Sequence, residues 1–446
     1  MNRCIHNPAQ NDFAIAKTAG VWLRTFVCIA FATSAPAIAN SALSNDEVAP
    51  RGGSFAIRTP KALLCELDGI QALDAAVILI EDGLIAAVGK QGELELPEGT
   101  PIFDAGSSWV MPGLIDLHSH VGGIGGVNDA VFQVNSGLRA SATAVAGNSR
   151  LKRPLAAGIT TILYIPGSAT NVGGQGVLLN THTGNYKDVL IRDPGSLKVA
   201  QGDNPKRWGY RMNRTLMNHH IRYSLRQGKA YAKRWEAFEA GGAELPERHI
   251  NLDVYRDLYK NEIGISVHTQ YYQVVLATLR ILRMEFGFPT FIDHGSFDSF
   301  ELGEIAEEIG VPAILGPREV MWPSTSTRFR ADGKAVGSAW GFQQKGVKLI
   351  GFNTDAPVLP EEELPLQSAM GVRYGFDNSE MAAVRGLTIV PAIVCGAGDF
   401  LGSLEVGKHA DVVVLTGDPS DPRTTVQFVW IKGELVYEQP EGVRLW

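Results

Sequence analysis

The sequence predicts an α/β fold: a (β/α)8 TIM barrel with a small β-sandwich domain assembled from the N- and C-terminal segments. Three observations lead to this prediction. The chain has 446 residues, enough for a barrel of about 250 residues and a smaller domain. Its middle part, 109–400, alternates apolar strand-like runs with helical stretches, as repeated βα units do. Short strand-like segments separated by turns lie on both sides, in 40–108 and 401–446.

The composition excludes several classes of protein. Hydrophobic residues make up 45% of the chain and charged residues 20%, which are ordinary values for a globular protein, so a disordered or collagen-like chain is excluded. Two of the four cysteines lie in the N-terminal segment, which leaves Cys65 and Cys395 for the rest. A disulfide scaffold and a cysteine-based zinc module are therefore excluded. The ten histidines are the part of the composition that needs an explanation.

Residues 1–39 have the pattern of a cleaved signal peptide. Basic residues, among them Arg3 and Arg24, precede a short apolar run at Phe26–Ala32, and Ala37–Ala39 provides the small residues of a cleavage site. An N-terminal membrane anchor is the alternative, but the apolar run is far shorter than the ~20 residues that span a bilayer. We therefore expect a mature start near Asn40 and a periplasmic or secreted protein.

The two terminal segments are predicted to form strands that belong together. Four short β-like runs lie in the first segment and three in the last, with turn residues between them. These runs are Phe55–Ile57, Leu63–Leu64, Ala76–Ile80, Leu84–Val88, Ala410–Leu415, Val426–Ile431 and Leu435–Tyr437. We expect one β-domain to be assembled from both ends of the chain.

Eight apolar segments of the middle part are predicted as barrel strands. They are Val110–His118, Ile159–Ile165, Val177–Leu179, Leu197–Ala200, Ile263–His268, Thr290–His294, Ala313–Leu315 and Leu349–Asn353. Eight strands over roughly 290 residues suit a (β/α)8 barrel. The glycine-rich run Gly173–Gly176 is expected to be a pocket loop, because it lacks the following Lys-Ser/Thr of a phosphate-binding loop.

Histidines and one aspartate stand at the ends of several predicted strands. His118 and His120 follow the first strand, His268 ends the fifth, His294 ends the sixth, and Asp355 follows the eighth. Side chains two apart on a strand point to the same face, so the first two imidazoles point together. The carboxyl ends of barrel strands gather at one mouth, where barrel active sites lie. Converging imidazole and carboxylate groups predict a metal site there.

These segments resemble the amidohydrolase superfamily. Met111–His120 together with His268, His294 and Asp355 resembles its metal-ligand pattern, and Leu404–Val414 resembles its C-terminal β-domain signature. The resemblance covers nearly the whole chain after the signal segment and is greatest to secreted imidazolonepropionase-like members. It implies a metal-dependent hydrolase with one or two divalent ions. Zinc is the default for His-rich ligation, with manganese, iron, cobalt and nickel as alternatives.

Lys198, in the fourth predicted strand, has two interpretations. In relatives with two metals, a lysine carbamylated by CO₂ occupies this strand and bridges the ions. With such a bridge, the resemblance implies one ion on His118 and His120 and a second on His268 and His294; without it, these residues form or flank a single site. The alternative is a lysine that steers an anionic substrate or snorkels from the sheet.

The expected function is hydrolysis of a C–N bond in an amide, cyclic amide or dipeptide-like substrate by metal-activated hydroxide. Asp355, also a predicted ligand, would take the proton of the attacking water and deliver it to the leaving nitrogen. Arg211 and Arg318 are candidate partners for a substrate carboxylate. A heterocycle deaminase on the same fold and a non-catalytic metal- or ligand-binding protein are the alternatives.

One basic segment raises the question of a nucleic-acid partner. Residues 206–235 hold nine basic residues and no acid, with interleaved aromatic side chains that could stack on single-stranded bases. The whole chain, however, has a net charge of −7, and a solvated helix with pocket-lining arginines suits it better. We expect a small-molecule substrate, no nucleic acid and no stable membrane insertion after signal cleavage, and we leave a homo-oligomer open.

Overall fold

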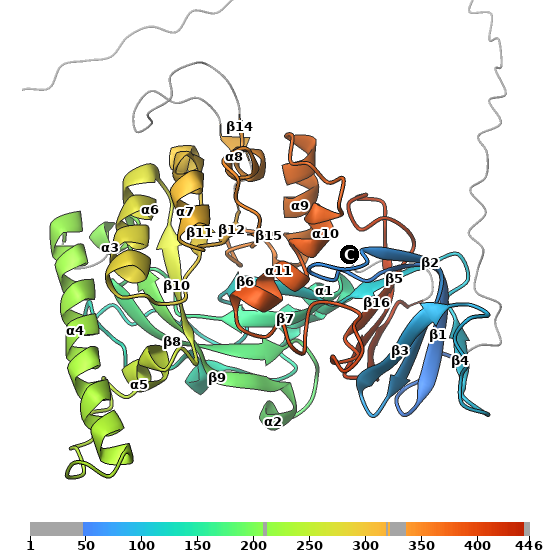
Figure 1. The fold of residues 1–446 in the computed structure, drawn as a ribbon, viewed down its shortest axis with the longest axis horizontal. Helices are drawn as coiled ribbons and strands as arrows, with labels where there is room; N and C mark the ends of the chain where they lie inside the picture. Colours follow the sequence, from blue (N-terminus) through green and yellow to red (C-terminus); the bar gives the residue numbers. More distant parts are fainter. Residues whose placement is uncertain (1–47, 208–211, 318–319, 322–335, 441–446) are drawn as a thin grey trace, which may run out of the picture. The chain divides into compact units, whose positions relative to one another are not determined.

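The structure is a computed structural model that describes residues 48–440 except 208–211, 318–319 and 322–335. The predicted signal peptide, 1–39, lies outside the described residues, as do the candidate substrate-binding residues Arg211 and Arg318. Two eight-stranded sheets organise the described chain (Figure 1).

The first sheet is built from both ends of the chain. Its strands are β1 (Phe55–Leu63), β2 (Ala72–Glu81), β3 (Leu84–Lys90), β4 (Ile102–Asp104), β5 (Trp109–Pro112), β16 (Val412–Leu415), β17 (Val426–Ile431) and β18 (Glu434–Glu438). Their order is β18-β17-β16-β5-β1-β2-β3, and β4 pairs with β1. Figure 1 shows the blue N-terminal strands beside the red C-terminal ones. The prediction of a β-domain drawn from both termini is confirmed, with all of its strands in one hydrogen-bonded sheet.

Aromatic side chains from both termini form the core of this terminal sheet. The ring of Phe103 lies edge-on to Phe428 at 5.0 Å and to Trp430 at 5.5 Å between centroids. Such pairs contribute about 0.5–1.5 kcal/mol beyond the burial of their area. The indole N–H of Trp430 donates to the carbonyl of Pro50 at 2.8 Å. These contacts attach β17 to the N-terminal strands.

The second sheet forms a nearly closed barrel. Its strands are β6 (Leu114–Ser119), β7 (Ile159–Tyr164), β8 (Val172–Asn180), β9 (Leu190–Ala200), β10 (Gly264–Thr269), β11 (Ile292–His294), β12 (Ala313–Leu315) and β15 (Ile350–Phe352). They pair in the order β15-β12-β11-β10-β9-β8-β7-β6, and an isolated bridge between Ser119 and Ala356 joins the two ends. The predicted eight-stranded barrel is thereby confirmed.

One barrel strand departs from the repeated βα pattern. β8 runs antiparallel to both β7 and β9, so these strands follow one another without the crossover helix that parallel neighbours need. Gly173–Gly176 lies inside β8, and the expectation of a pocket loop there is wrong, because the strand begins before the predicted Val177–Leu179. A Cβ at Gly176 would lie only 3.0 Å from Oγ of Ser196 on β9. The glycines therefore leave room for side chains of the neighbouring strand.

The chain passes from the terminal sheet into the barrel at Gly113. The predicted strand Val110–His118 is divided there between β5, in the terminal sheet, and β6, which begins in the barrel at Leu114. A Cβ at Gly113 would lie only 2.1 Å from Oγ1 of Thr160, which explains the glycine. A single residue thus separates the terminal sheet from the strand that carries His118.

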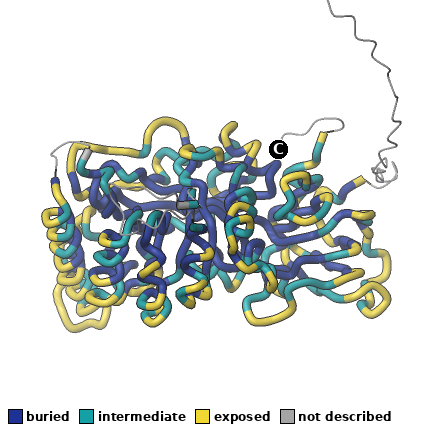
Figure 2. Tube along the Cα trace, turned by 90° about the horizontal axis from the view of Figure 1, so that it is seen from above, coloured by how far each residue is buried: buried dark blue, intermediate teal, exposed yellow. Residues whose placement is uncertain are grey.

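Helices and short turns pack around the barrel strands. They are η1 (Ala140–Thr143), η2 (Ser149–Leu151), α1 (Lys152–Ala156), α2 (Tyr186–Val189), α3 (Asn204–Arg207), α4 (Arg214–Glu239), α5 (Val254–Tyr259), α6 (Tyr272–Thr278), η3 (Leu279–Glu285), η4 (Phe297–Leu302), α7 (Gly303–Glu308), α8 (Ser338–Gln344), η5 (Glu361–Glu363), α9 (Leu364–Arg373), α10 (Ala382–Arg385) and α11 (Ile389–Val394). A small ribbon of β13 (Val320–Met321) and β14 (Val336–Gly337) completes the described elements. In Figure 2 the buried interior is surrounded by exposed outer surfaces. Among the described residues, no helix has the length and apolar character needed to cross a membrane.

Candidate metal centre

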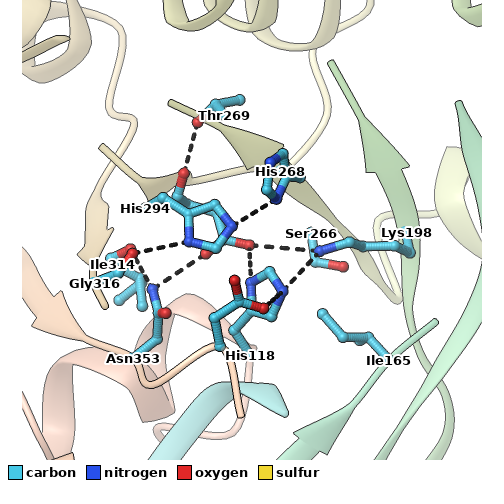
Figure 3. Close-up of polar contacts among 12 residues, drawn as sticks. His118, Ile165, Lys198, Ser266, His268, Thr269, His294, Ile314, Gly316 and Asn353 are labelled. Carbon is cyan, nitrogen blue, oxygen red and sulfur yellow. Dashed lines mark hydrogen bonds and ion pairs between the residues drawn. The ribbon is translucent and has the colours of Figure 1, made fainter. Parts of the chain in front are cut away.

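The barrel brings predicted side chains from five strand ends to one place. His118 lies on β6, Lys198 on β9, His268 on β10 and His294 at the end of β11, while Asp355 follows β15. Figure 3 shows the three imidazoles and the lysine converging inside the barrel. His118, Lys198, His268 and His294 are all buried. The strand-end positions in the sequence therefore correspond to a common location in space.

One possible metal-binding group consists of His118, His120 and Asp355. Oδ1 of Asp355 lies 3.2 Å from Nε2 of His118 and 3.3 Å from Nε2 of His120. Nδ1 of His120 lies 2.8 Å from the carbonyl of Ile165, which requires the ring proton on Nδ1 and leaves Nε2 free as a ligand. The ligand atoms of the three residues all lie within 4.8 Å of one another, close enough to share one ion.

A second group shares His118 with the first and adds Asp293 and His294. Oδ2 of Asp293 accepts a hydrogen bond from Nδ1 of His118 at 2.7 Å, between two fully buried side chains. Nδ1 of His294 donates to the carbonyl of Gly316 at 2.8 Å, so its Nε2 is the nitrogen that faces the cluster. Sequence reasoning misses Asp293, although an acidic residue directly before a strand-end histidine is a usable signal.

His268 contacts this second group without belonging to it. Its Nδ1 lies 2.8 Å from Nε2 of His294, while its Nε2 is buried and has no hydrogen-bond partner. The loop after β9 closes over the ring: the N–H groups of Gln201 and Gly202 donate to the carbonyl of His268, both at 3.1 Å. A buried polar atom without a partner is costly and usually has a ligand or water to satisfy it. Nε2 is therefore a candidate ligand atom.

Lys198 lies within the cluster rather than at its surface. Its side chain is completely buried, with Nζ 3.2 Å from Nε2 of His118 and 3.8 Å from Oδ2 of Asp293. It does not snorkel to solvent. Burial lowers the pKa of its amine, although the carboxylates of Asp293 and Asp355 oppose that shift.

Burial governs the protonation of most of the imidazoles. It lowers the pKa of His120 and His294 and, with the help of His294, lowers that of His268 well below its usual value. Burial also acts against protonation of His118, but the carboxylates of Asp293 and Asp355 together outweigh it and raise the pKa to about 9. Neutral imidazoles are the form that binds a metal, and at His118 an ion would compete with a proton.

The carboxylates at the centre are held in their ionised form. Burial alone would raise the pKa of Asp293 and of Asp355, but the neighbouring imidazoles, His118 first and His294 with it, hold both below the usual range. Ionised carboxylates and neutral imidazoles in one buried cluster provide the nitrogen and oxygen donors that suit a divalent transition-metal ion.

Known proteins resemble this chain in sequence and structure. Residues 334–436 match the amidohydrolase family. Amidohydrolase TasK of Hapsidospora irregularis is 26% identical over 401 residues, a match that covers 81% of this chain but only 40% of TasK. An imidazolonepropionase of Pseudomonas putida is 24% identical over 372 residues and covers 77% of this chain and 88% of that protein. The crystal structure of an amidohydrolase from Thermotoga maritima has a TM-score of 0.76 at 28% identity, covering 86% of this chain and 100% of that chain.

The chain belongs to the amidohydrolase superfamily of hydrolases. The sequence-based resemblance to this superfamily is confirmed.

Beneath the candidate ligand positions, polar side chains fix the backbone that carries them. The carboxylate of Asp116 accepts the N–H of His118 at 2.8 Å, and the N–H and hydroxyl of Thr354 at 3.0 and 2.6 Å. Nδ2 of Asn353 donates to Oδ1 of Asp293 at 3.2 Å. Sequence reasoning gives these residues no role. Together they attach β6 and β11 to the segment that precedes Asp355.

Proposed function

We propose that the chain is a metal-dependent hydrolase that cleaves the C–N bond of an amide, cyclic amide or dipeptide-like substrate. The observation that carries this proposal is the pair of His/Asp groups that share His118 inside the barrel, one fully buried and one partly exposed. The similarity to a protein named amidohydrolase TasK supports an amide as the bond that is cleaved.

We propose His118, His120 and Asp355 as the residues that hold a divalent ion, and zinc as that ion from the ligand types. A divalent ion needs unprotonated nitrogen donors. The Nε2 of His268, which has no hydrogen-bond partner, and the neutral imidazoles around it are such donors. A divalent ion there would supply the Lewis acid that polarises a scissile carbonyl and lowers the pKa of an attacking water.

The chain's own acid–base group in this proposal is Asp355. Its side chain is 15% exposed beside the fully buried His118, so it can meet both a substrate and the cluster. The ionised carboxylate takes a proton from the attacking water as the oxygen bonds to the carbonyl carbon. It then gives that proton to the leaving nitrogen as the C–N bond breaks, so that the nitrogen departs as a neutral amine.

We further propose that Lys198 is carbamylated. Its neutral amine would attack CO₂ and lose a proton, and the resulting carbamate would place an anionic oxygen beside His118, His268 and His294. The complete burial of Lys198 and its 3.2 Å approach to Nε2 of His118 support this role. Native mass spectrometry should detect the mass of one CO₂ on the wild type and not on Lys198→Ala. An unmodified wild-type lysine would leave the alternative of a cation that binds an anionic substrate.

The main experiment combines metal analysis with a turnover screen. Purified protein reconstituted with Zn²⁺ is offered N-acyl amino acids, dipeptides and cyclic amides, together with aminated heterocycles. We expect bound zinc and the formation of a primary or secondary amine, released from the acyclic substrates and retained on the ring-opened product of the cyclic amides. Release of ammonia from the heterocycles alone would favour the deaminase, and binding without turnover would favour a non-catalytic protein.

We also propose that the protein is exported and acts on a small molecule rather than on nucleic acid. The support is the signal-peptide pattern of residues 1–39 and the net charge of −7. N-terminal sequencing of the protein from a periplasmic or culture fraction should begin near Asn40. Recovery of the full-length chain from membranes would instead support the N-terminal anchor.

A further inference from the structure

A cavity of about 280 Å³ lies where the chain passes from the terminal sheet into the barrel. Met111 on β5 and Leu114 at the start of β6, on either side of Gly113, both line it. None of its lining residues is a candidate metal ligand. His118 lies near the other end of β6, about 13 Å along the strand from Leu114. The cavity is therefore separate from the candidate metal centre.

The walls of this cavity are mostly apolar. Aliphatic side chains of β5, β6, β16, β17 and α9 form most of the lining, and residues 419–424 complete it. Two of the lining residues are small: Ala157, which follows α1, and Ala369, on α9. Larger side chains at these positions would reduce the volume. An apolar pocket of a few hundred Å³ with few polar groups is typical of a site for a small molecule.

The polar part of the lining has one group that lacks a partner. Oγ of Ser420 is buried and makes no hydrogen bond, although the N–H of Ser420 donates to Oδ1 of Asp418 at 2.8 Å. The hydroxyl of Thr424 donates to the carbonyl of Asp418 at 2.6 Å. The carboxylate of Asp421 accepts hydrogen bonds of 2.6–3.1 Å from the side chain of Arg423. The charge of Asp421 is thus compensated, while Ser420 has a hydroxyl to offer.

The size and charge of the cavity define what it can hold. An apolar cavity of about 150 Å³ holds benzene, so in proportion 280 Å³ suits roughly eleven non-hydrogen atoms. A helix of a partner protein, about 10–12 Å across, is too large for this volume. An anion would be repelled by Asp421, and a cation would have to compete with Arg423 for that carboxylate. A small neutral molecule fits best.

We propose that this cavity is a second ligand site, which binds a neutral, mostly apolar small molecule of about eleven non-hydrogen atoms. The single hydrogen-bonding group of the ligand contacts the hydroxyl of Ser420. The bound molecule touches Met111 and Leu114 together, so it connects the terminal sheet to the barrel. The site needs no metal, and the proposal does not depend on the proposed function.

The first test uses 2-naphthol, a bicyclic phenol of this size that is neutral at neutral pH. Isothermal titration calorimetry on the full chain should show one site with a dissociation constant of about 10–100 μM. Ala369→Phe fills the cavity and should weaken binding by about tenfold or more. Ala230→Phe, the same change at an exposed position of α4, should leave the affinity within about twofold. Equal losses in the two variants, or none in Ala369→Phe, would overturn the proposal.

A second variant tests the polar contact without filling the cavity. Ser420→Ala should weaken 2-naphthol by about 2–10-fold, the value of one neutral hydrogen bond, and leave naphthalene unchanged. The same loss for both ligands, or for neither, would show that the ligand makes no hydrogen bond to Ser420. 2-Naphthoate, an anion of similar shape, should bind about tenfold more weakly than 2-naphthol. Equal binding of the two would contradict a site for neutral molecules.

Other locations and occupants give different results in the same titration. Saturating 2-naphthol should leave the Zn²⁺ affinity within about twofold, whereas competition would place the probe at the metal centre. If a second copy of the chain covers the cavity, the probe affinity will fall as the protein concentration rises. If residues 441–446 occupy it, only a variant that ends at Pro440 will bind the probe. Each of these three results would overturn the proposal.

Discussion

The two sides of the candidate metal centre are built differently. On the β6 side, formed by His118, His120 and Asp355, buried groups such as Asp116 hold the backbone through several hydrogen bonds. On the β10 side, formed by His268, His294 and Lys198, Nε2 of His268 has no partner. The contrast indicates that hydrogen bonds within the chain preorganise the β6 side, whereas on the β10 side one buried nitrogen is left without a partner from the chain.

The largest expected effect comes from the β6 side. Asp355→Asn keeps the shape of the side chain but cannot accept a proton from water. We expect kcat to fall by about 10²–10⁴-fold, the usual contribution of a general base. Steady-state kinetics on a substrate from the turnover screen provide the measurement, with circular dichroism as a control for folding. Undiminished turnover would exclude Asp355 as the proton carrier.

Metal binding should stabilise the β10 side more than the β6 side. Zn²⁺ at 100 times its dissociation constant should raise the free energy of unfolding by about 2.7 kcal/mol if it binds only the folded state. Hydrogen exchange should show the added protection mainly in β10 and in residues 201–207, because those segments surround the unpartnered His268. Protection confined to β6 would mean that the β10 side holds no ion.

Gly202 offers a steric way to disturb the β10 side alone. A Cβ at this position would lie 2.4 Å from Cδ2 of His268, so Gly202→Ala must displace the ring or the loop. We expect about a tenfold loss of Zn²⁺ affinity in competition titrations. Gly126→Ala is the matched control, because a Cβ there would have no other atom within 4 Å. An equal loss in both variants would show that the effect is not specific to His268.

Two buried threonines provide the smallest and most closely matched comparison. The hydroxyl of Thr354 donates to the carboxylate of Asp116 at 2.6 Å on the β6 side, and that of Thr269 donates to the backbone carbonyl of Asp293 at 2.8 Å on the β10 side. Bonds to charged groups contribute about 1.5–3 kcal/mol and neutral ones about 0.5–1.5 kcal/mol. Thr354→Val should therefore lower the free energy of unfolding, measured by urea denaturation, by about 1 kcal/mol more than Thr269→Val. A larger loss in Thr269→Val would reverse the comparison.

Much of the site could be predicted from the sequence because its residues follow apolar strands. His118, His268 and His294 each end a hydrophobic run, and the barrel gathers such ends at one mouth. The direction of β8 could not be predicted, because hydrophobic pattern and glycine content are the same for parallel and antiparallel strands. The start of β8 at Val172 could not be predicted either, because the glycines that follow have no apolar side chains to show the pattern of a strand.

The supporting residues were harder to predict for a different reason. Glu361 opens a run of three glutamates, and such a run normally indicates an exposed, charged turn. Only the tertiary structure shows that this turn lies against Ser119, whose hydroxyl donates to Glu361 at 2.6 Å. Asp293 is easier to predict, because it directly precedes a candidate ligand. Its hydrogen bond to His118 is not predictable, because it joins β11 to β6, which are not neighbours in the sheet.

The glycine at 113 has a consequence for how the protein could be divided or recombined. β5 pairs with β16 from the far end of the chain, and β6, one residue later, carries His118. The two candidate ligands of the His118–His120 segment thus follow directly on a strand whose partner is supplied by residues 412–415. A truncation that removes β16 leaves β5 without one of its neighbours, so the barrel is not an exchangeable module. Any chimera with another barrel must carry both ends of the chain.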